Sequence, residues 1–71
     1  MTGKLHKCKT GSLAEVAAVE RELISRGYVQ NPEADQKDMP PGEYITVSLA
    51  NVRHHRNGEI QYRIAWSEQG E

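Results

Sequence analysis

The chain has too little cysteine for a disulfide-bonded protein and no apolar run long enough for a membrane-spanning one. Among its 71 residues Cys8 is the only cysteine, so no disulfide can form within the chain. No stretch is long and apolar enough to cross a membrane as a helix. The lysines near the start are not followed by the apolar segment that a signal peptide requires. We therefore expect one domain in the cytoplasm, with a reduced thiol and no membrane association.

Patterns typical of catalysis or cofactor binding are also missing. His6 and Cys8 would point the same way on a strand, but no orienting third group accompanies them. The side chains that could ligate a metal are His6, Cys8, His54 and His55. Adjacent histidines on a strand point to opposite faces, and no C-x-x-C or H-x-x-x-H spacing occurs. With no glycine-rich phosphate loop either, the sequence predicts no enzyme, cofactor, metal or small-molecule substrate.

The clearest element that is present is an amphipathic helix over residues 13–26. Ser12 and Glu15 have the spacing of a capping box, in which each side chain binds a free backbone amide of the first turn. Gly27 suits the left-handed position that follows the last turn. Apolar side chains recur at helical spacing between these signals, at Leu13, Val16, Ala17, Val19, Leu23 and Ile24.

Glu20 is placed inside the apolar arc of this helix, where a carboxylate needs a partner or water. Three explanations are open. In the first, Glu20 extends past the edge of the sheet into water. In the second, it binds a basic or hydroxyl group on the inner sheet face, and in the third it belongs to a partner interface. Arg53 and Tyr62 are the candidates for the internal pair.

The other elements are strands and one polar loop. We expect a strand over about 4–9, a short strand near 28–30, a loop over 31–42 that its prolines exclude from regular structure, and a hairpin over about 43–67. Asn57-Gly58 is the preferred pair for a two-residue turn, which would place Leu49 opposite Trp66 and Arg53 opposite Tyr62. The face that meets the helix would then carry Ile45, Val47, Leu49, Ile60, Tyr62, Ile64 and Trp66. The opposite face would be half polar and solvated.

These elements define the predicted fold. It is a single α+β domain spanning residues 1–71, with one helix packed on a small, mainly antiparallel sheet. The predicted order is strand, helix, an optional short strand, and a C-terminal β-hairpin.

The charge distribution supplies the candidate binding surface. Net charge is −1, but the basic residues form two groups, one at the start and one on the hairpin, whose distal end is expected to project beyond the helix. Arg53 beside Tyr62 would form an exposed cationic and aromatic patch there. The predicted partner-binding residues are Arg53, His54, His55, Arg56, Tyr62 and Arg63, with Lys4, Lys7 and Lys9 as a second patch. A merely solvated surface, a protein contact and a nucleic-acid contact all remain open.

The chain resembles a general type of protein in its size, its helix between Ser12 and Gly27, and its hairpin around Asn57-Gly58. This type comprises the small proteins that bacteriophages make to bind and redirect host machinery such as RNA polymerase or CRISPR effector complexes. The resemblance implies an inhibitor or regulator in the host cytoplasm, for example of transcription, and assigns no role to any residue. The expected function is therefore a non-enzymatic module that docks on a larger protein or complex. The alternative is a nucleic-acid-binding module that uses the basic hairpin.

Overall fold

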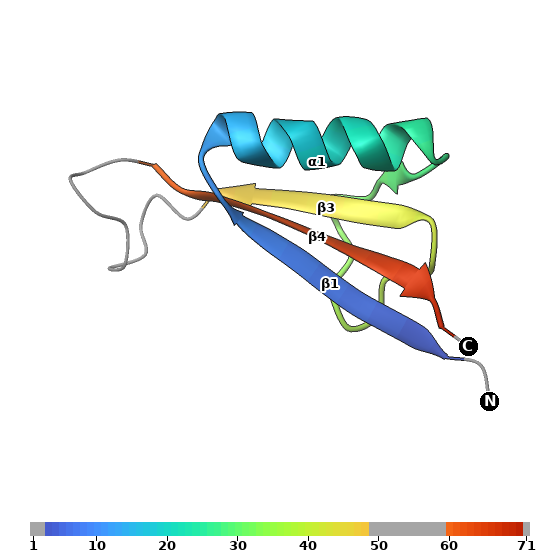
Figure 1. Ribbon diagram of the computed structural model, residues 1–71. Helices are drawn as coiled ribbons and strands as arrows, with labels where there is room; N and C mark the ends of the chain where they lie inside the picture. Colours follow the sequence, from blue (N-terminus) through green and yellow to red (C-terminus); the bar gives the residue numbers. More distant parts are fainter. Residues whose placement is uncertain (1–2, 49–59, 71) are drawn as a thin grey trace.

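One helix lies on a four-stranded sheet in the computed structural model, which describes residues 3–48 and 60–70 (Figure 1). In chain order the elements are β1 (Lys4–Gly11), α1 (Leu13–Ser25), β2 (Val29–Gln30), β3 (Glu43–Ser48) and β4 (Tyr62–Gln69). The spatial order is β1-β4-β3-β2. Strand β4 pairs antiparallel with both β1 and β3, and the short β2 pairs parallel with β3. The predicted α+β class and the mainly antiparallel sheet are confirmed.

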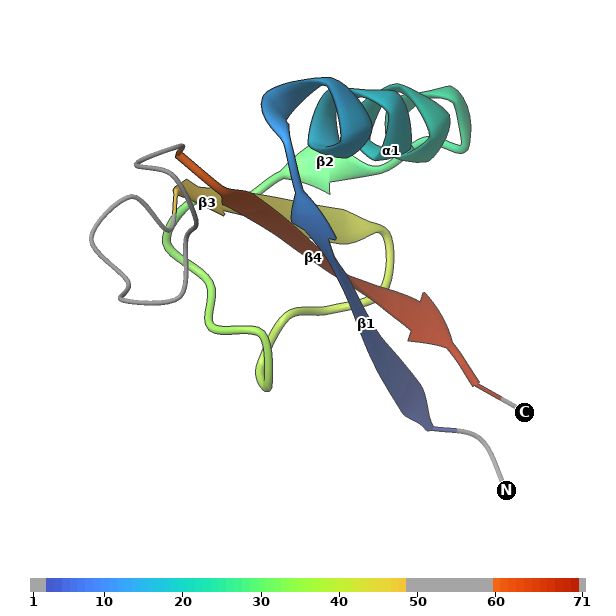
Figure 2. The same ribbon diagram turned by 60° about the vertical axis from the view of Figure 1, so that its left-hand side comes forward.

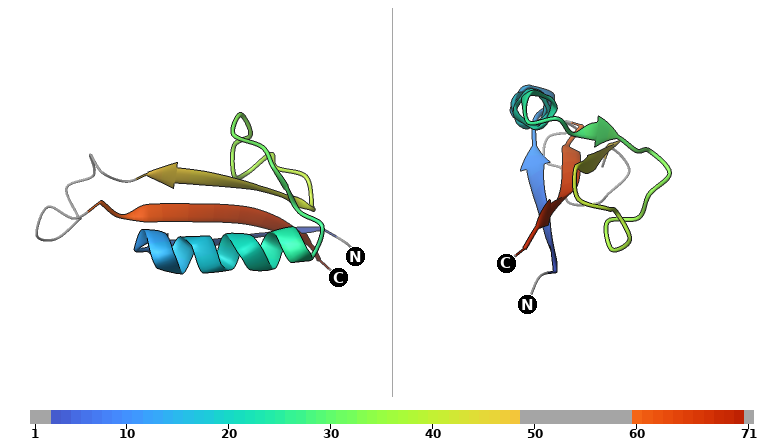
Figure 3. Two further views of the ribbon diagram at one scale, coloured as in Figure 1. Left: turned by 90° about the horizontal axis from the view of Figure 1, so that it is seen from above. Right: turned by 90° about the vertical axis from the view of Figure 1, so that its right-hand side faces the viewer.

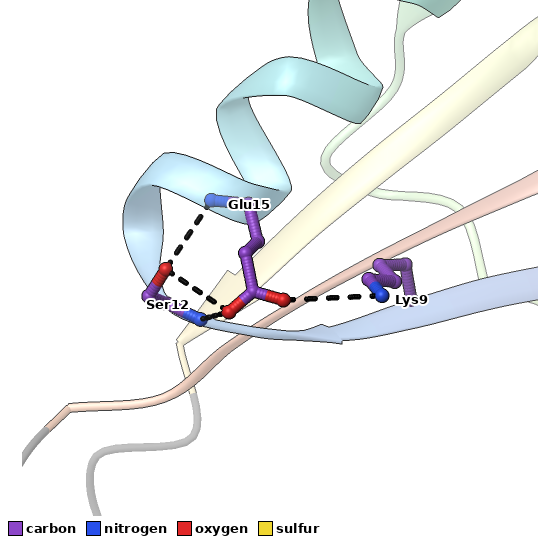
Figure 4. A network of polar contacts seen from close by, with 3 residues as sticks. All are labelled: Lys9, Ser12 and Glu15. Carbon is purple, nitrogen blue, oxygen red and sulfur yellow. Dashed lines mark hydrogen bonds and ion pairs between the residues drawn. The ribbon is translucent and has the colours of Figure 1, made fainter.

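Helix α1 begins with the predicted capping box. The Glu15 amide donates to the Ser12 hydroxyl at 3.3 Å, and the Ser12 amide donates to the Glu15 carboxylate at 3.4 Å (Figure 4). Beyond Ser25 the chain turns at Gly27, whose φ of 93° is costly for any residue with a side chain. Local signals therefore define both ends of the helix, as predicted.

The main core lies between α1 and the sheet, with the helix running along one face (Figure 3). Its buried members are Val16, Leu23, Tyr44 and Ile64, and Val19, Tyr28, Tyr62 and Trp66 pack around them. The apolar stripe of the helix is only partly used. Leu13 and Ile24 are 59% and 53% exposed, because the helix is covered on one side only.

The register between β3 and β4 differs from the prediction. Trp66 lies opposite Tyr44, not opposite Leu49, and this odd displacement turns β3 over relative to β4. Tyr44 therefore joins the helix-facing core, whereas Ile45 packs on the opposite side of the sheet. The prediction assumed unbroken pairing up to Asn57-Gly58, and that turn lies outside the described residues.

The second face of the sheet is partly covered, contrary to the expectation that it is solvated. The segment 31–42 runs across the side opposite α1 (Figure 2). Met39 from this segment is completely buried against Ile45 and Ala65, and Ala34 packs beside them. At the end of the segment, the Gly42 amide donates to the Ser67 carbonyl of β4. Although it has no regular structure, the segment forms a small second core.

Candidate protein-binding surface

The structure describes five of the nine predicted partner-binding residues. Arg53, His54, His55 and Arg56 lie outside the described residues. Strand β1 carries Lys4, Lys7 and Lys9, and the neighbouring β4 carries Tyr62 and Arg63. The described members of the two predicted groups therefore lie on adjacent strands, an arrangement that requires the β1–β4 pairing and could not be read from the sequence.

The lysines form a line along the sheet edge and do not gather at one end. Lys4 is opposite Gln69 at one end of β1, while Lys9 is opposite Ile64 near the other end. Every residue from Lys4 to Thr10 is exposed. The basic character of the chain's start is therefore distributed over the full length of an edge strand (Figure 1).

Tyr62 has a different position from the one predicted, which was opposite Arg53, a residue outside the described ranges. It lies opposite Ser48 in β3 and Gly11 in β1, and its ring packs around the main core. Side chains alternate along a strand, so Tyr62 faces α1 and its neighbour Arg63 faces the other side of the sheet. The predicted cross-strand pairing of Arg53 with Tyr62 is wrong for the same reason as the register of β3.

Arg63 is the one cation of β4. Its Nε is buried and lacks a hydrogen-bond partner in the described parts of the chain. An open depression next to it is lined by Asp35, Gln36 and Lys37. These neighbours of Arg63 were not predicted from the sequence, because only the packing of segment 31–42 on the sheet brings them to β4.

Lys7 belongs to an ionic cluster centred on Glu68, on the helix side of the sheet. The Glu68 carboxylate is 3.3 Å from Lys7 Nζ and 3.6 Å from Arg26, and it accepts a 2.8 Å hydrogen bond from the Trp66 indole. The indole hydrogen bond, followed by the charges of Lys7 and Arg26, lowers the pKa of Glu68, although partial burial opposes this. The cluster joins β1, β4 and the end of α1.

We expect Glu68→Gln to reduce the free energy of unfolding by about 1 kcal/mol at neutral pH, because two ion pairs are lost. The folded-state pKa is lowered, so this contribution is present above the ordinary value of 4.5 and disappears as the pH falls through the folded-state pKa. Urea denaturation at several pH values should therefore show that the unfolding free energies of the unmodified protein and of Glu68→Gln become equal in acid. The matched control is Glu22→Gln on the exposed side of α1. A difference that stays constant with pH would contradict this assignment.

Lys9 is also paired, whereas Lys4 is not. Lys9 Nζ lies 3.9 Å from Glu15, which links β1 to the capping box (Figure 4). In the described ranges Lys4 has no ion pair. The side chain of Lys4 shares the face opposite α1 with those of His6 and Cys8, because these residues alternate with Lys7 and Lys9 along the strand. Within the described residues, no three His, Cys, Asp or Glu side chains gather as a metal site would require.

Glu20 acts on a hydroxyl group of the inner sheet face, the kind of partner that one of the three explanations named. The partner is Tyr44, not Tyr62 or Arg53, because the observed register brings Tyr44 to the helix. Burial raises the pKa of Tyr44, and the hydrogen bond to the Glu20 carboxylate raises it further. Glu20 therefore connects α1 to β3.

Comparison with known proteins returned no match among family models, curated proteins or solved structures. Within the described residues no helix is long and apolar enough to span a membrane.

Proposed function

We propose that this protein is a non-enzymatic binding module, a small inhibitor or regulator that docks on a larger protein machine such as bacterial RNA polymerase. The observation that supports this function is strand β1. It lies at the end of the sheet, seven of its eight residues are exposed, and it carries three lysines. Exposed edge strands are recurring sites of protein recognition, because their backbone groups can pair with a second chain.

The ion pairs of β1 favour a protein partner over nucleic acid. Lys7 and Lys9 already contact Glu68 and Glu15, which would oppose a phosphate backbone placed along the strand. The chain also has a net charge of −1, whereas nucleic-acid-binding domains usually present an uncompensated basic surface. Arg53 and Arg56, which the sequence places on the predicted hairpin, remain candidates for a second contact with the same partner.

The test is affinity capture from bacterial lysate with the tagged protein, with and without nuclease, at low and high salt. We expect a defined protein complex that persists after nuclease treatment, and weaker capture when Arg53 and Arg56 are both replaced by alanine. Recovery of nucleic acid alone, with affinity falling linearly in log salt, would favour the nucleic-acid alternative. Capture of neither would contradict the proposed function.

A further inference from the structure

The backbone of β1 has one hydrogen-bonded side and one free side, and the structure identifies which residues face each. The Gly70 amide donates to the Gly3 carbonyl, in the same register that places Lys4 opposite Gln69. Directly opposed residues in an antiparallel ladder alternate between hydrogen-bonded and non-hydrogen-bonded pairs. The backbone groups that point toward β4 are therefore those of Leu5, Lys7 and Lys9. Those that point away from the sheet belong to Lys4, His6, Cys8 and Thr10.

Nothing in the described chain covers this free side. Helix α1 lies on a face of the sheet, segment 31–42 lies on the other face, and β2 borders the opposite edge (Figures 1 and 2). Among the described strands, β1 forms a ladder with β4 alone. The outward amide and carbonyl groups of these four alternate residues are therefore available to an additional strand.

The charge of β1 selects among strands that could pair there. It carries Lys4, Lys7 and Lys9 and no acidic residue, so a second copy of β1 would bring like charges together. An acidic strand would instead be attracted, more strongly on one face than on the other. On one face it meets Lys4, which has no ion pair in the described ranges. On the other face Lys7 and Lys9 are already paired with Glu68 and Glu15, so the attraction there is weaker.

We propose that β1 receives an extended, acidic segment of a protein partner as an additional strand of the sheet. This inference rests on the proposed function and specifies how the partner binds. Main-chain hydrogen bonds to the outward groups would supply affinity, and the lysines would select alternating acidic side chains. The same lysines disfavour pairing between copies of this chain, so they protect the edge from self-association and favour an acidic strand there.

The first test measures amide hydrogen exchange by NMR with a short synthetic peptide in which glutamate alternates with threonine. At a peptide concentration ten times Kd, the outward amides of His6, Cys8 and Thr10 should exchange about tenfold more slowly. The inward amides of Lys7 and Lys9 should change less, because they are already bonded to β4. A peptide with lysine in place of glutamate should not protect these amides. Unchanged exchange of the outward amides would overturn the proposal, and so would equal protection of outward and inward amides. Protection that rises with protein concentration in the absence of peptide would also overturn it, because it indicates pairing between copies of this chain.

The second test removes one outward donor without disturbing the ladder to β4. Cys8→Pro eliminates an outward N–H, and proline is tolerated in edge strands at such positions. Cys8→Ala is the matched control, because it removes the thiol and keeps the amide. We expect at least tenfold weaker peptide binding by Cys8→Pro and unchanged binding by Cys8→Ala. If Cys8→Pro does not fold, as judged by circular dichroism, the exchange pattern of the unmodified protein decides.

The third test concerns charge. Lys4→Gln should weaken peptide binding by about two- to fivefold, as expected for an exposed ion pair, whereas Lys37→Gln in segment 31–42 should leave it unchanged. Equal effects of the two variants would contradict recognition at β1.

If lysate capture succeeds with Cys8→Pro as well as with the unmodified protein, strand addition is wrong but the protein-binding function stands. If no variant captures a protein, the proposed function itself fails.

Discussion

Replacing Leu23 by alanine is expected to lower the free energy of unfolding by about 2–4 kcal/mol, because a fully buried side chain is lost and the cavity cannot collapse completely. Leu23 is 1% exposed and packs with Val16, Tyr44 and Ile64 at the centre of the main core. A chain of this length has a total stability of only about 4–10 kcal/mol. The variant should therefore be partly unfolded near physiological temperature, which thermal or urea denaturation followed by circular dichroism would measure.

The adjacent Ile24 is the matched control for this prediction. The sequence places both residues in the apolar stripe of the helix, but Ile24 is 53% exposed. Ile24→Ala should change the unfolding free energy by less than about 1 kcal/mol, as is usual for substitutions at the surface. Similar losses for both variants would mean that α1 is rotated about its axis, away from the orientation that buries Leu23 and exposes Ile24.

Met39→Ala is expected to cost about 2–4 kcal/mol, although Met39 lies in a segment without regular structure. Its side chain is 0% exposed and fills the space between Ile45 and Ala65 on the face of the sheet opposite α1. Removing it would separate the segment 31–42 from the sheet and leave Ile45 in contact with water. Denaturation experiments of the same kind test this expectation.

The control in that segment is Lys37→Ala. Lys37 is exposed, so its truncation should change stability by about 0.5 kcal/mol or less. If Met39→Ala were as mild as Lys37→Ala, segment 31–42 would not be packed on the sheet. The depression beside Arg63 would then not exist, because Asp35, Gln36 and Lys37 form its rim.

Local signals explain the parts of the fold that could be predicted. The capping box of Ser12 with Glu15 and the glycine at position 27 act within one helical turn, so the sequence was sufficient to locate α1. The short strand near Val29 and the antiparallel pairing of the last two long strands were also predictable from composition and alternation. The order of elements along the chain, and hence the α+β class, followed from these local features.

The candidate site was predictable only in part. The lysines of β1 and Arg63 were identified from charge alone, but their arrangement as a line on an edge strand beside β4 depends on pairing between the two ends of the chain. For Glu20 three explanations were open, one of them a basic or hydroxyl partner on the sheet with Arg53 and Tyr62 as candidates, and the register instead brings Tyr44 to it. The role of Met39 gave no sequence signal, because a single methionine among polar residues has no periodicity.

By itself, the sequence determined the helix, its ends, the strand-forming segments and the distribution of charge, because each depends on residues that are near one another in the chain. Only the tertiary structure decided the register of β3 on β4, the covering of the second sheet face by residues 31–42, and the position of β1 at a free edge. Residues 44–47 alternate between two sets that can both be buried, Tyr44 with Thr46 and Ile45 with Val47, so local pattern could not choose between them. The choice was made by packing, which buries Tyr44 against α1 and Ile45 against Met39.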